Sequence, residues 1–220
     1  MKLEAILFDL DGTLLYTLED LALSVNAVLH RYGYPEHPLQ DYRFLVGEGV
    51  EMLVKNSLPE GSRSPELINE LMQAVQEEYR CRWQDHTRPY SGVSELLNGL
   101  EEKKIPKAIL SNKPHEFTVL TVENILPHWQ FDAVEGVRAN MPRKPDPAGA
   151  IAIAHKLGVE PSQFAYLGDT KTDMQTALAA GMFPVGATWG FRPEEELKES
   201  GAKKLVNSPE EVLTVIHNGC

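Results

Sequence analysis

Two carboxylates one residue apart, Asp9 and Asp11, directly follow the apolar run of residues 5–8. A short, wholly apolar run is typical of a strand buried inside a sheet. Alternate side chains of an extended chain point to the same side, so the two carboxylates would share one small volume. There they would bind a cation or titrate as a coupled pair. Gly12 then permits a tight turn, and Thr13 adds a hydroxyl and an amide donor.

The dipeptide Asp11-Gly12 has a second interpretation, because Asp-Gly between apolar residues is also typical of a tight β-hairpin. A hairpin needs a partner strand directly after the turn. The residues after Thr13 lead instead into a helical pattern that begins near Leu18. We therefore favour a strand that delivers Asp9 and Asp11 to the edge of a sheet.

Further polar motifs follow two later apolar runs. Ser111-Asn112-Lys113 ends one, Gly168-Asp169 ends another with Asp173 close behind, and Lys144 precedes an expected helix. Each motif alone has an ordinary explanation as a helix cap, a surface charge or an acid in the first turn of a helix. The separate explanations do not account for their joint occurrence at the carboxyl ends of strands, where open α/β sheets bind their ligands.

The elements that would position these residues alternate between helix and strand from residue 89 onward. We expect strands over 107–111, 131–135, 164–168, 184–188 and 204–206. We expect helices over 92–103, 115–125, 147–157, 172–180 and 209–217. This alternation predicts an α/β fold with a Rossmann-like, mostly parallel sheet and helices on both faces.

Residues 15–88, in contrast, show helical patterns and no strand signal. Apolar residues recur at helical spacing within 18–29 and 65–79, and a shorter helix is expected over 50–55. We therefore expect an inserted all-helical cap domain over 16–88 and an α/β core domain formed by 1–15 and 89–220.

Composition excludes several classes of partner. The chain has 220 residues, of which 42% are hydrophobic, enough for a substantial core, and a formal net charge of -11 that disfavours nucleic acid and anionic membranes. Cys81 and Cys220 suggest neither a disulfide framework nor a metal site. With no leader or membrane segment evident, we expect a cytoplasmic protein. No histidine pair has metal spacing, and only His115 is expected near the site.

The motifs together resemble those of the haloacid dehalogenase-like hydrolases, and within them the phosphoglycolate phosphatase-like members with a helical cap after the first strand. The resemblance covers nearly the whole chain. It rests on Asp9-Leu10-Asp11-Gly12-Thr13, Ser111-Asn112-Lys113-Pro114, Arg143-Lys144-Pro145-Asp146-Pro147 and Gly168-Asp169-Thr170-Lys171-Thr172-Asp173. It implies a Mg²⁺-dependent phosphomonoesterase acting on a small anionic phosphorylated metabolite, with 2-phosphoglycolate the leading candidate.

The resemblance also implies residue roles. Asp9 would attack phosphorus to give an aspartyl-phosphate, and Asp11 would protonate the leaving oxygen and then activate water. Ser111 and Lys144 would hold the phosphoryl oxygens, and Lys144 would keep Asp9 ionised. Asn112 and the turn at Gly12 and Thr13 would supply further phosphate donors. The implied Mg²⁺ ligands are Asp9, Asp11 through its backbone carbonyl, Asp169 and Asp173.

Other interpretations stay open. A β-phosphoglucomutase-like enzyme shares the acid pair and transfers the phosphoryl group to a sugar, while a non-catalytic binding protein would not need all these residues. Asp11 disfavours a dehalogenase, and Lys55 has no context for the imine of a phosphonatase. Arg43, beside Gly47-Glu48-Gly49, is either a ligand for a substrate carboxylate or an ordinary surface arginine. Tyr16-Thr17 departs from the subgroup pattern at the expected hinge, so the identity of the substrate stays open. The sequence is compatible with a monomer and with a homodimer.

Overall fold

A computed structural model describes residues 2–139 and 141–218. Its main sheet has the strand order β5-β4-β1-β6-β7-β8, and every neighbouring pair is parallel. The strands are β1 (Ala5–Phe8), β4 (Lys107–Pro114), β5 (Ala133–Val137), β6 (Phe164–Gly168), β7 (Phe183–Ala187) and β8 (Lys204–Val206). The predicted α/β fold is therefore confirmed, with β1 between β4 and β6.

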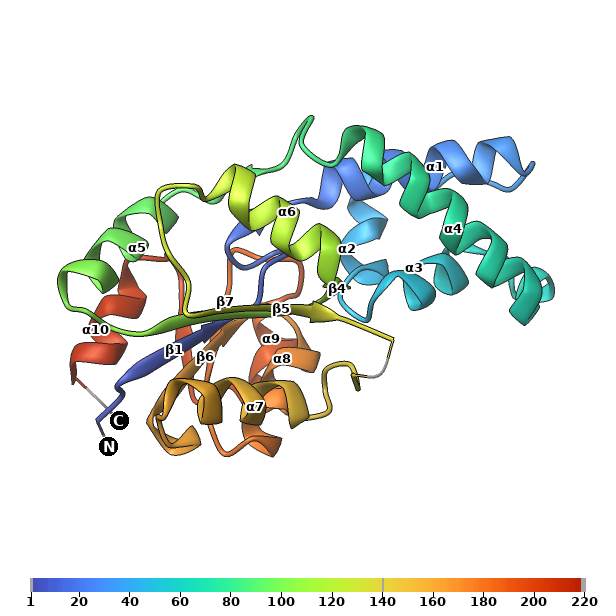
Figure 1. The fold of residues 1–220 in the computed structure, drawn as a ribbon. Helices are drawn as coiled ribbons and strands as arrows, with labels where there is room; N and C mark the ends of the chain where they lie inside the picture. The colour runs from blue at the N-terminus through green and yellow to red at the C-terminus, as the bar shows by residue number, and fades with distance from the viewer. Residues whose placement is uncertain (1, 140, 219–220) are drawn as a thin grey trace.

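Helices cover both faces of this sheet (Figure 1). Alternate residues of β1 point to opposite faces, so Ile6 and Phe8 enter one apolar cluster while Ala5 and Leu7 enter another. The first cluster is shared with α5 (Val93–Glu102), α6 (His115–Ile125) and α10 (Glu211–Asn218). The second is shared with α7 (Ala148–Leu157) and α8 (Lys171–Ala179). The short helix α9 (Glu194–Glu199) precedes β8.

Four helices lie together beyond the carboxyl ends of the strands (Figure 1). They are α1 (Leu18–Arg31), α2 (Tyr42–Leu45), α3 (Val50–Ser57) and α4 (Pro65–Arg82), here called the helical segment. They bury an apolar cluster of their own, to which Phe191 is added from beyond residue 88. Ser64 caps α4 by accepting a hydrogen bond from the Leu67 amide, and Pro65 occupies the first turn.

A two-stranded antiparallel strip joins the helical segment to the rest of the chain. β2 (Leu15–Tyr16) pairs with β3 (Arg88–Pro89). The expectation that 15–88 contains no strand is therefore wrong at both ends, because two-residue strands are too short to show an alternating pattern. The sequence pattern also does not predict the helices α2 and α9, because they too are short. β5 begins at Ala133, two residues later than the expected strand over 131–135.

Asp20 joins the start of the helical segment, after β2, to its end, before β3. Its fully buried carboxylate, in the first turn of α1, accepts hydrogen bonds from the amides of His86 and Thr87 and from the Thr87 hydroxyl, at 2.7 to 3.1 Å. Since Asp20→Ala would leave buried donors unpaired, we expect it to lower the free energy of unfolding by about 2–4 kcal/mol. Urea denaturation would measure this, with the exposed Asp85→Ala as control, and equal effects of the two variants would contradict it.

Among the described residues, none of the helices combines the length and the apolar character that crossing a bilayer requires.

Candidate active site

The carboxyl ends of the strands and the helical segment enclose a cavity of about 70 Å³. The structure brings most of the predicted site residues to its polar wall, although they lie far apart in the sequence. These are Asp9, Asp11, Ser111, Asn112, Lys144 and Asp173. Asp9 and Asp11 follow β1, Ser111 and Asn112 lie in the carboxyl-terminal half of β4, Lys144 precedes α7 and Asp173 begins α8. The parallel sheet therefore places them at one edge.

Lys144 connects two of the acids. Its buried ammonium donates to Asp9 Oδ1 at 2.6 Å and to Asp173 Oδ1 at 2.7 Å. Asp9 directly follows β1, and its amide continues the strand pairing by donating to the Leu167 carbonyl. Burial alone would lower the pKa of Lys144, but the two carboxylates raise it well above its ordinary value, so the ammonium stays charged.

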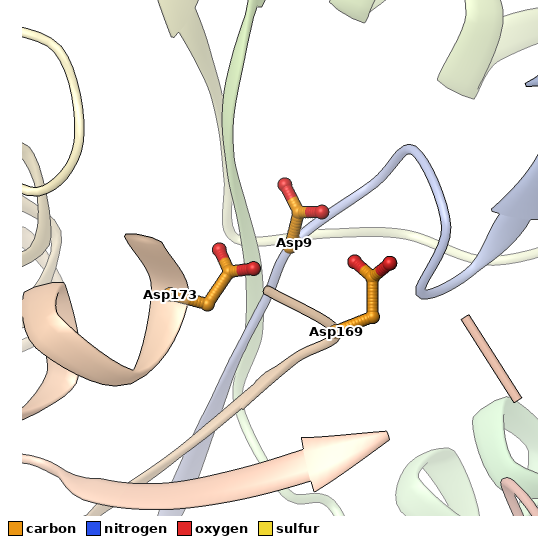
Figure 2. Close-up of side chains that lie close together, drawn as sticks. All are labelled: Asp9, Asp169 and Asp173. Carbon is orange, nitrogen blue, oxygen red and sulfur yellow. The ribbon is translucent and has the colours of Figure 1, made fainter. Parts of the chain in front are cut away.

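Three carboxylates converge at this point. Figure 2 shows the carboxyl groups of Asp9, Asp169 and Asp173 near one another and pointing to the same side, from the ends of β1 and β6 and from α8. One oxygen of each lies within 4.8 Å of the others. Asp169 is held by the Thr13 hydroxyl at 3.1 Å and the Phe191 amide at 2.7 Å.

The acidic cluster has the chemistry of a divalent cation site. Burial, together with the neighbouring acids, raises the pKa of Asp9 well above its usual range although Lys144 opposes this, and burial and Asp173 raise the pKa of Asp169 to about 7. Carboxylates this close together need either protons or a cation between them. Oxygen ligands suit a hard ion such as Mg²⁺. Asp173 also accepts from the backbone and hydroxyl of Thr170, so both of its oxygens are already hydrogen-bonded.

Asp11 stands apart from the acidic cluster. Its two oxygens receive the ammonium of Lys113 at 3.0 and 3.3 Å, and the same ammonium donates to the Tyr79 hydroxyl of α4 at 2.8 Å. Burial alone would lower the pKa of Lys113, but Asp11 and Tyr79 raise it above the ordinary value. The result is a fixed carboxylate on the cavity wall, connected through Lys113 to the helical segment.

If Asp11 is the proton donor that the resemblance implies, Lys113→Met should lower kcat on an alkyl phosphate by about 10- to 100-fold, because Asp11 loses the group that orients it. The loss should be much smaller on 4-nitrophenyl phosphate, whose leaving group departs without a proton. Steady-state phosphate release on both substrates measures the difference. Tyr79→Phe keeps the Lys113–Asp11 pair and should have the weaker effect, so equal losses on both substrates would contradict the orienting role.

Three residues expected to bind phosphate have other partners. The Asn112 side chain is occupied by Lys144 backbone atoms and the Gly47 carbonyl, at 2.9 to 3.1 Å. The amides of Gly12 and Thr13 donate within their own turn, to Leu15 and Leu10. Gly12 has φ +92°, and a side chain there would overlap the Asp169 carboxylate. These residues therefore shape the site. Ser111 lines the cavity, and its hydroxyl oxygen accepts a hydrogen bond from the Lys113 amide at 3.2 Å.

Two further expectations also differ from the structure. Arg43 does not line the cavity, because its guanidinium donates to the carbonyls of Gly190 and Phe191 at 2.8 and 3.2 Å. His115 likewise lies outside the cavity lining, with its ring beside Arg138 and the Gly136 amide. The hairpin alternative fails as well, since β1 pairs only with β4 and β6 within the described residues.

Sequence reasoning missed Lys113 and Tyr79 as site residues. Lys113 is visible in the motif Ser111-Asn112-Lys113, and a lysine at the carboxyl end of a buried strand is a signal that could have found it. Tyr79 appears in the sequence only as part of the apolar face of a helix. No local pattern distinguishes a hydroxyl that meets a distant ammonium from one that faces solvent.

Comparison with known proteins gives a consistent result. The family model for haloacid dehalogenase-like hydrolases matches residues 6–187. A phosphoglycolate phosphatase from Nitrosospira multiformis is 31% identical over 221 residues, which cover 98% of this chain and 96% of that protein. An N-acetylmuramic acid 6-phosphate phosphatase from Pseudomonas aeruginosa is 29% identical over 222 residues, which cover 98% of this chain and 96% of that protein.

A solved structure agrees in fold. It is a candidate phosphoglycolate phosphatase from Lactobacillus delbrueckii subsp. bulgaricus, with a TM-score of 0.92 and 28% identity, covering 98% of this chain and 99% of that one. The two named relatives hydrolyse different phosphomonoesters by name but share the reaction class. The chain belongs to the haloacid dehalogenase-like hydrolases, and it is a phosphatase.

Proposed function

We propose that this phosphatase is a Mg²⁺-dependent phosphomonoesterase that forms an aspartyl-phosphate on Asp9. The observation that carries the proposal is the position of Asp9, which lies on the cavity wall with one oxygen on Lys144 at 2.6 Å. Within the described part of the chain, its other oxygen accepts no hydrogen bond from a side chain and is available to attack. Asp11 lies on the same wall, two residues further on.

In the first half of the reaction, an Asp9 oxygen bonds to phosphorus while the bond from phosphorus to the ester oxygen breaks. Asp11 donates a proton to that oxygen, so the alcohol leaves neutral. In the second half, water attacks phosphorus and Asp11 takes the proton of that water, which releases phosphate and restores the Asp9 carboxylate. Lys144 and the Ser111 hydroxyl would hold the phosphoryl oxygens throughout.

The residues suited to hold Mg²⁺ are Asp9 and Asp169, with Asp173 supporting the site through Thr170 and Lys144. When bound, the ion supplies charge neutralisation between a dianionic phosphoryl group and the surrounding acids. Residues 16–88 would act as a cap domain that excludes water from the cavity. The position of α1 to α4 over the carboxyl ends of the strands supports that role (Figure 1).

Chelation should abolish turnover, and Mg²⁺ should restore it, because the acidic cluster otherwise repels a dianionic substrate. Mg²⁺ should also raise the melting temperature of the wild type by binding the folded state. Calorimetry of Asp169→Asn tests the site independently of activity, since this variant should lose the thermal response to Mg²⁺. Turnover in excess chelator, or an unchanged response in Asp169→Asn, would refute the assignment.

The resemblance in sequence and the name of the Nitrosospira multiformis relative put 2-phosphoglycolate first among small anionic metabolites to test. A panel of phosphorylated metabolites ranked by kcat/KM would establish the substrate. Release of inorganic phosphate from each substrate distinguishes hydrolysis from transfer to a sugar, in which free phosphate does not accumulate.

A further inference from the structure

The wall that the helical segment contributes to the cavity is mostly apolar. It consists of the side chains of Leu21, Val46, Val50, Leu53 and Val75, next to the glycines of the Gly47-Glu48-Gly49 loop. Among the described lining residues, only two polar side chains come from this segment, Gln76 and Tyr79, both on α4. The part of the substrate that faces this wall therefore meets hydrocarbon and two uncharged polar groups.

The basic groups of the cavity lining are already matched to acids. Lys144 contacts Asp9 and Asp173, and Lys113 contacts Asp11. Two lysines thus face three aspartates before any substrate enters. The phosphoryl group carries two negative charges, and Lys144 and a bound divalent ion would interact with it rather than with a second anionic group. Among the lining residues that the structure describes, no lysine remains for a second anionic group.

Three arginines in or in contact with the helical segment are hydrogen-bonded or ion-paired, and no arginine is among the described residues that line the cavity. Arg43 and Arg192 each donate to two backbone carbonyls across the junction between the helical segment and the loop after β7. Arg143 forms an ion pair with Glu51 of α3 and lies outside the lining of this cavity. Nη1 of Arg192 has no hydrogen-bond partner within the described residues, but Arg192 does not line the cavity. A carboxylate inside the cavity would have to draw one of these arginines out of its contacts or stay unpaired beside apolar side chains. Either alternative is unfavourable.

Gln76 is the group best placed to recognise the remainder of the substrate. Its side chain is half-buried on the cavity wall, and within the described part of the chain its amide makes no hydrogen bond. An amide offers a donor and an acceptor and suits a neutral hydroxyl or carbonyl. Tyr79, in contrast, is already bound by Lys113.

We infer that the group esterified to phosphate is uncharged, with an apolar surface against α1, α3 and α4 and a neutral hydrogen-bonding group at Gln76. The inference rests on the proposed function and narrows its substrate class. It reverses the ranking of candidate substrates that the resemblance suggests. 2-Phosphoglycolate is no longer first, because it carries a carboxylate one carbon from the ester oxygen. A phosphomonoester of similar size whose esterified group is uncharged should be the better substrate.

The test compares 2-phosphoglycolate with its carboxamide, which has the same shape without the second charge. With Mg²⁺ present, we expect kcat/KM for the carboxamide to exceed that for 2-phosphoglycolate by about tenfold or more, as for other sites that reject an unpaired charge. A second pair, 4-carboxyphenyl and 4-carbamoylphenyl phosphate, repeats the comparison with a larger apolar body.

Gln76→Lys supplies the missing cation. It should raise the ratio of kcat/KM for 2-phosphoglycolate over the carboxamide by about tenfold, because the new ammonium pairs with the carboxylate. Gln73→Lys is the matched control, since Gln73 is exposed on the same helix and adds the same charge to the protein. It should leave the ratio unchanged.

The outcomes separate the two proposals. A wild type that prefers the carboxylate-bearing ester in both comparisons, or equal ratios in Gln76→Lys and Gln73→Lys, would overturn the inference while leaving the phosphatase mechanism intact. Absence of Mg²⁺-dependent phosphate release from all four esters would instead overturn the proposed function. Preference for both carboxamides together with a selective effect of Gln76→Lys supports the inference.

Discussion

Asp9→Asn is expected to lower kcat for phosphate release by about ten-thousand-fold or more, because an amide oxygen does not form the acyl-phosphate on which both half-reactions of the proposed mechanism depend. The variant should fold, since an Asn oxygen can still accept the hydrogen bond from Lys144. It also removes one charge from a buried cluster whose members repel one another. Acid-quenched wild type should carry a phosphoryl group on the peptide that contains Asp9, and the variant should not.

Two controls make the Asp9 experiment decisive. Asp85→Asn changes an exposed acid outside the cavity lining and should keep full activity. Mass spectrometry of the Asp9→Asn protein guards against deamidation, which would regenerate the nucleophile. A correctly folded Asp9→Asn protein with undiminished turnover would rule out nucleophilic catalysis by this residue.

Lys144→Met should have the second largest effect, on both activity and stability. Lys144 is the cation in contact with Asp9 and Asp173, and its side chain is 3% exposed. Its removal leaves the buried carboxylates of Asp9 and Asp173 without the cation that they share, which costs about 3–5 kcal/mol in comparable cases. We also expect kcat to fall by about 100- to 1,000-fold, since the phosphoryl oxygens lose a fixed positive charge. Chemical denaturation and phosphate release measure the two losses separately.

Charge repulsion as the cause of instability can be checked by a second substitution. Asp173→Asn on the Lys144→Met background should recover part of the lost stability without recovering activity, because it removes one of the unpaired acids. The matched control is Lys171→Met, which removes an exposed lysine paired with Glu48 and should change stability by no more than about 1 kcal/mol. No recovery in the double variant would point to lost packing instead.

The polar residues of the candidate site can be predicted from the sequence because they lie at the carboxyl ends of buried strands. β1, β4 and β6 are wholly or almost wholly buried, so their apolar runs are unambiguous in the sequence, and the polar residues after them must meet at one edge. The sequence alone therefore places Asp9, Asp11 and Asp169 at that edge. The parallel order of strands then follows from the alternation of helix and strand.

Contacts between the helical segment and the sheet cannot be predicted in the same way. The place of Arg43 in the sequence suggests a substrate ligand, but its partners are carbonyls about 150 positions later. The contact of Tyr79 with Lys113 also joins two separate parts of the chain. Such pairs depend on how two units dock, and neither periodicity nor local propensity carries that information. The two-residue strands β2 and β3 fall below the length at which a pattern exists.

The pairing of β2 with β3 has a consequence for how this protein can change over evolutionary time. The chain leaves the sheet and returns to it at adjacent points, so the intervening stretch can lengthen, shorten or be replaced without altering the register of β1 with its neighbours. In the proposed mechanism, the residues that break the phosphate bond and most of those that meet the rest of the substrate would lie on separate stretches of chain. Mutation can explore new substrates in one while the reaction is preserved in the other.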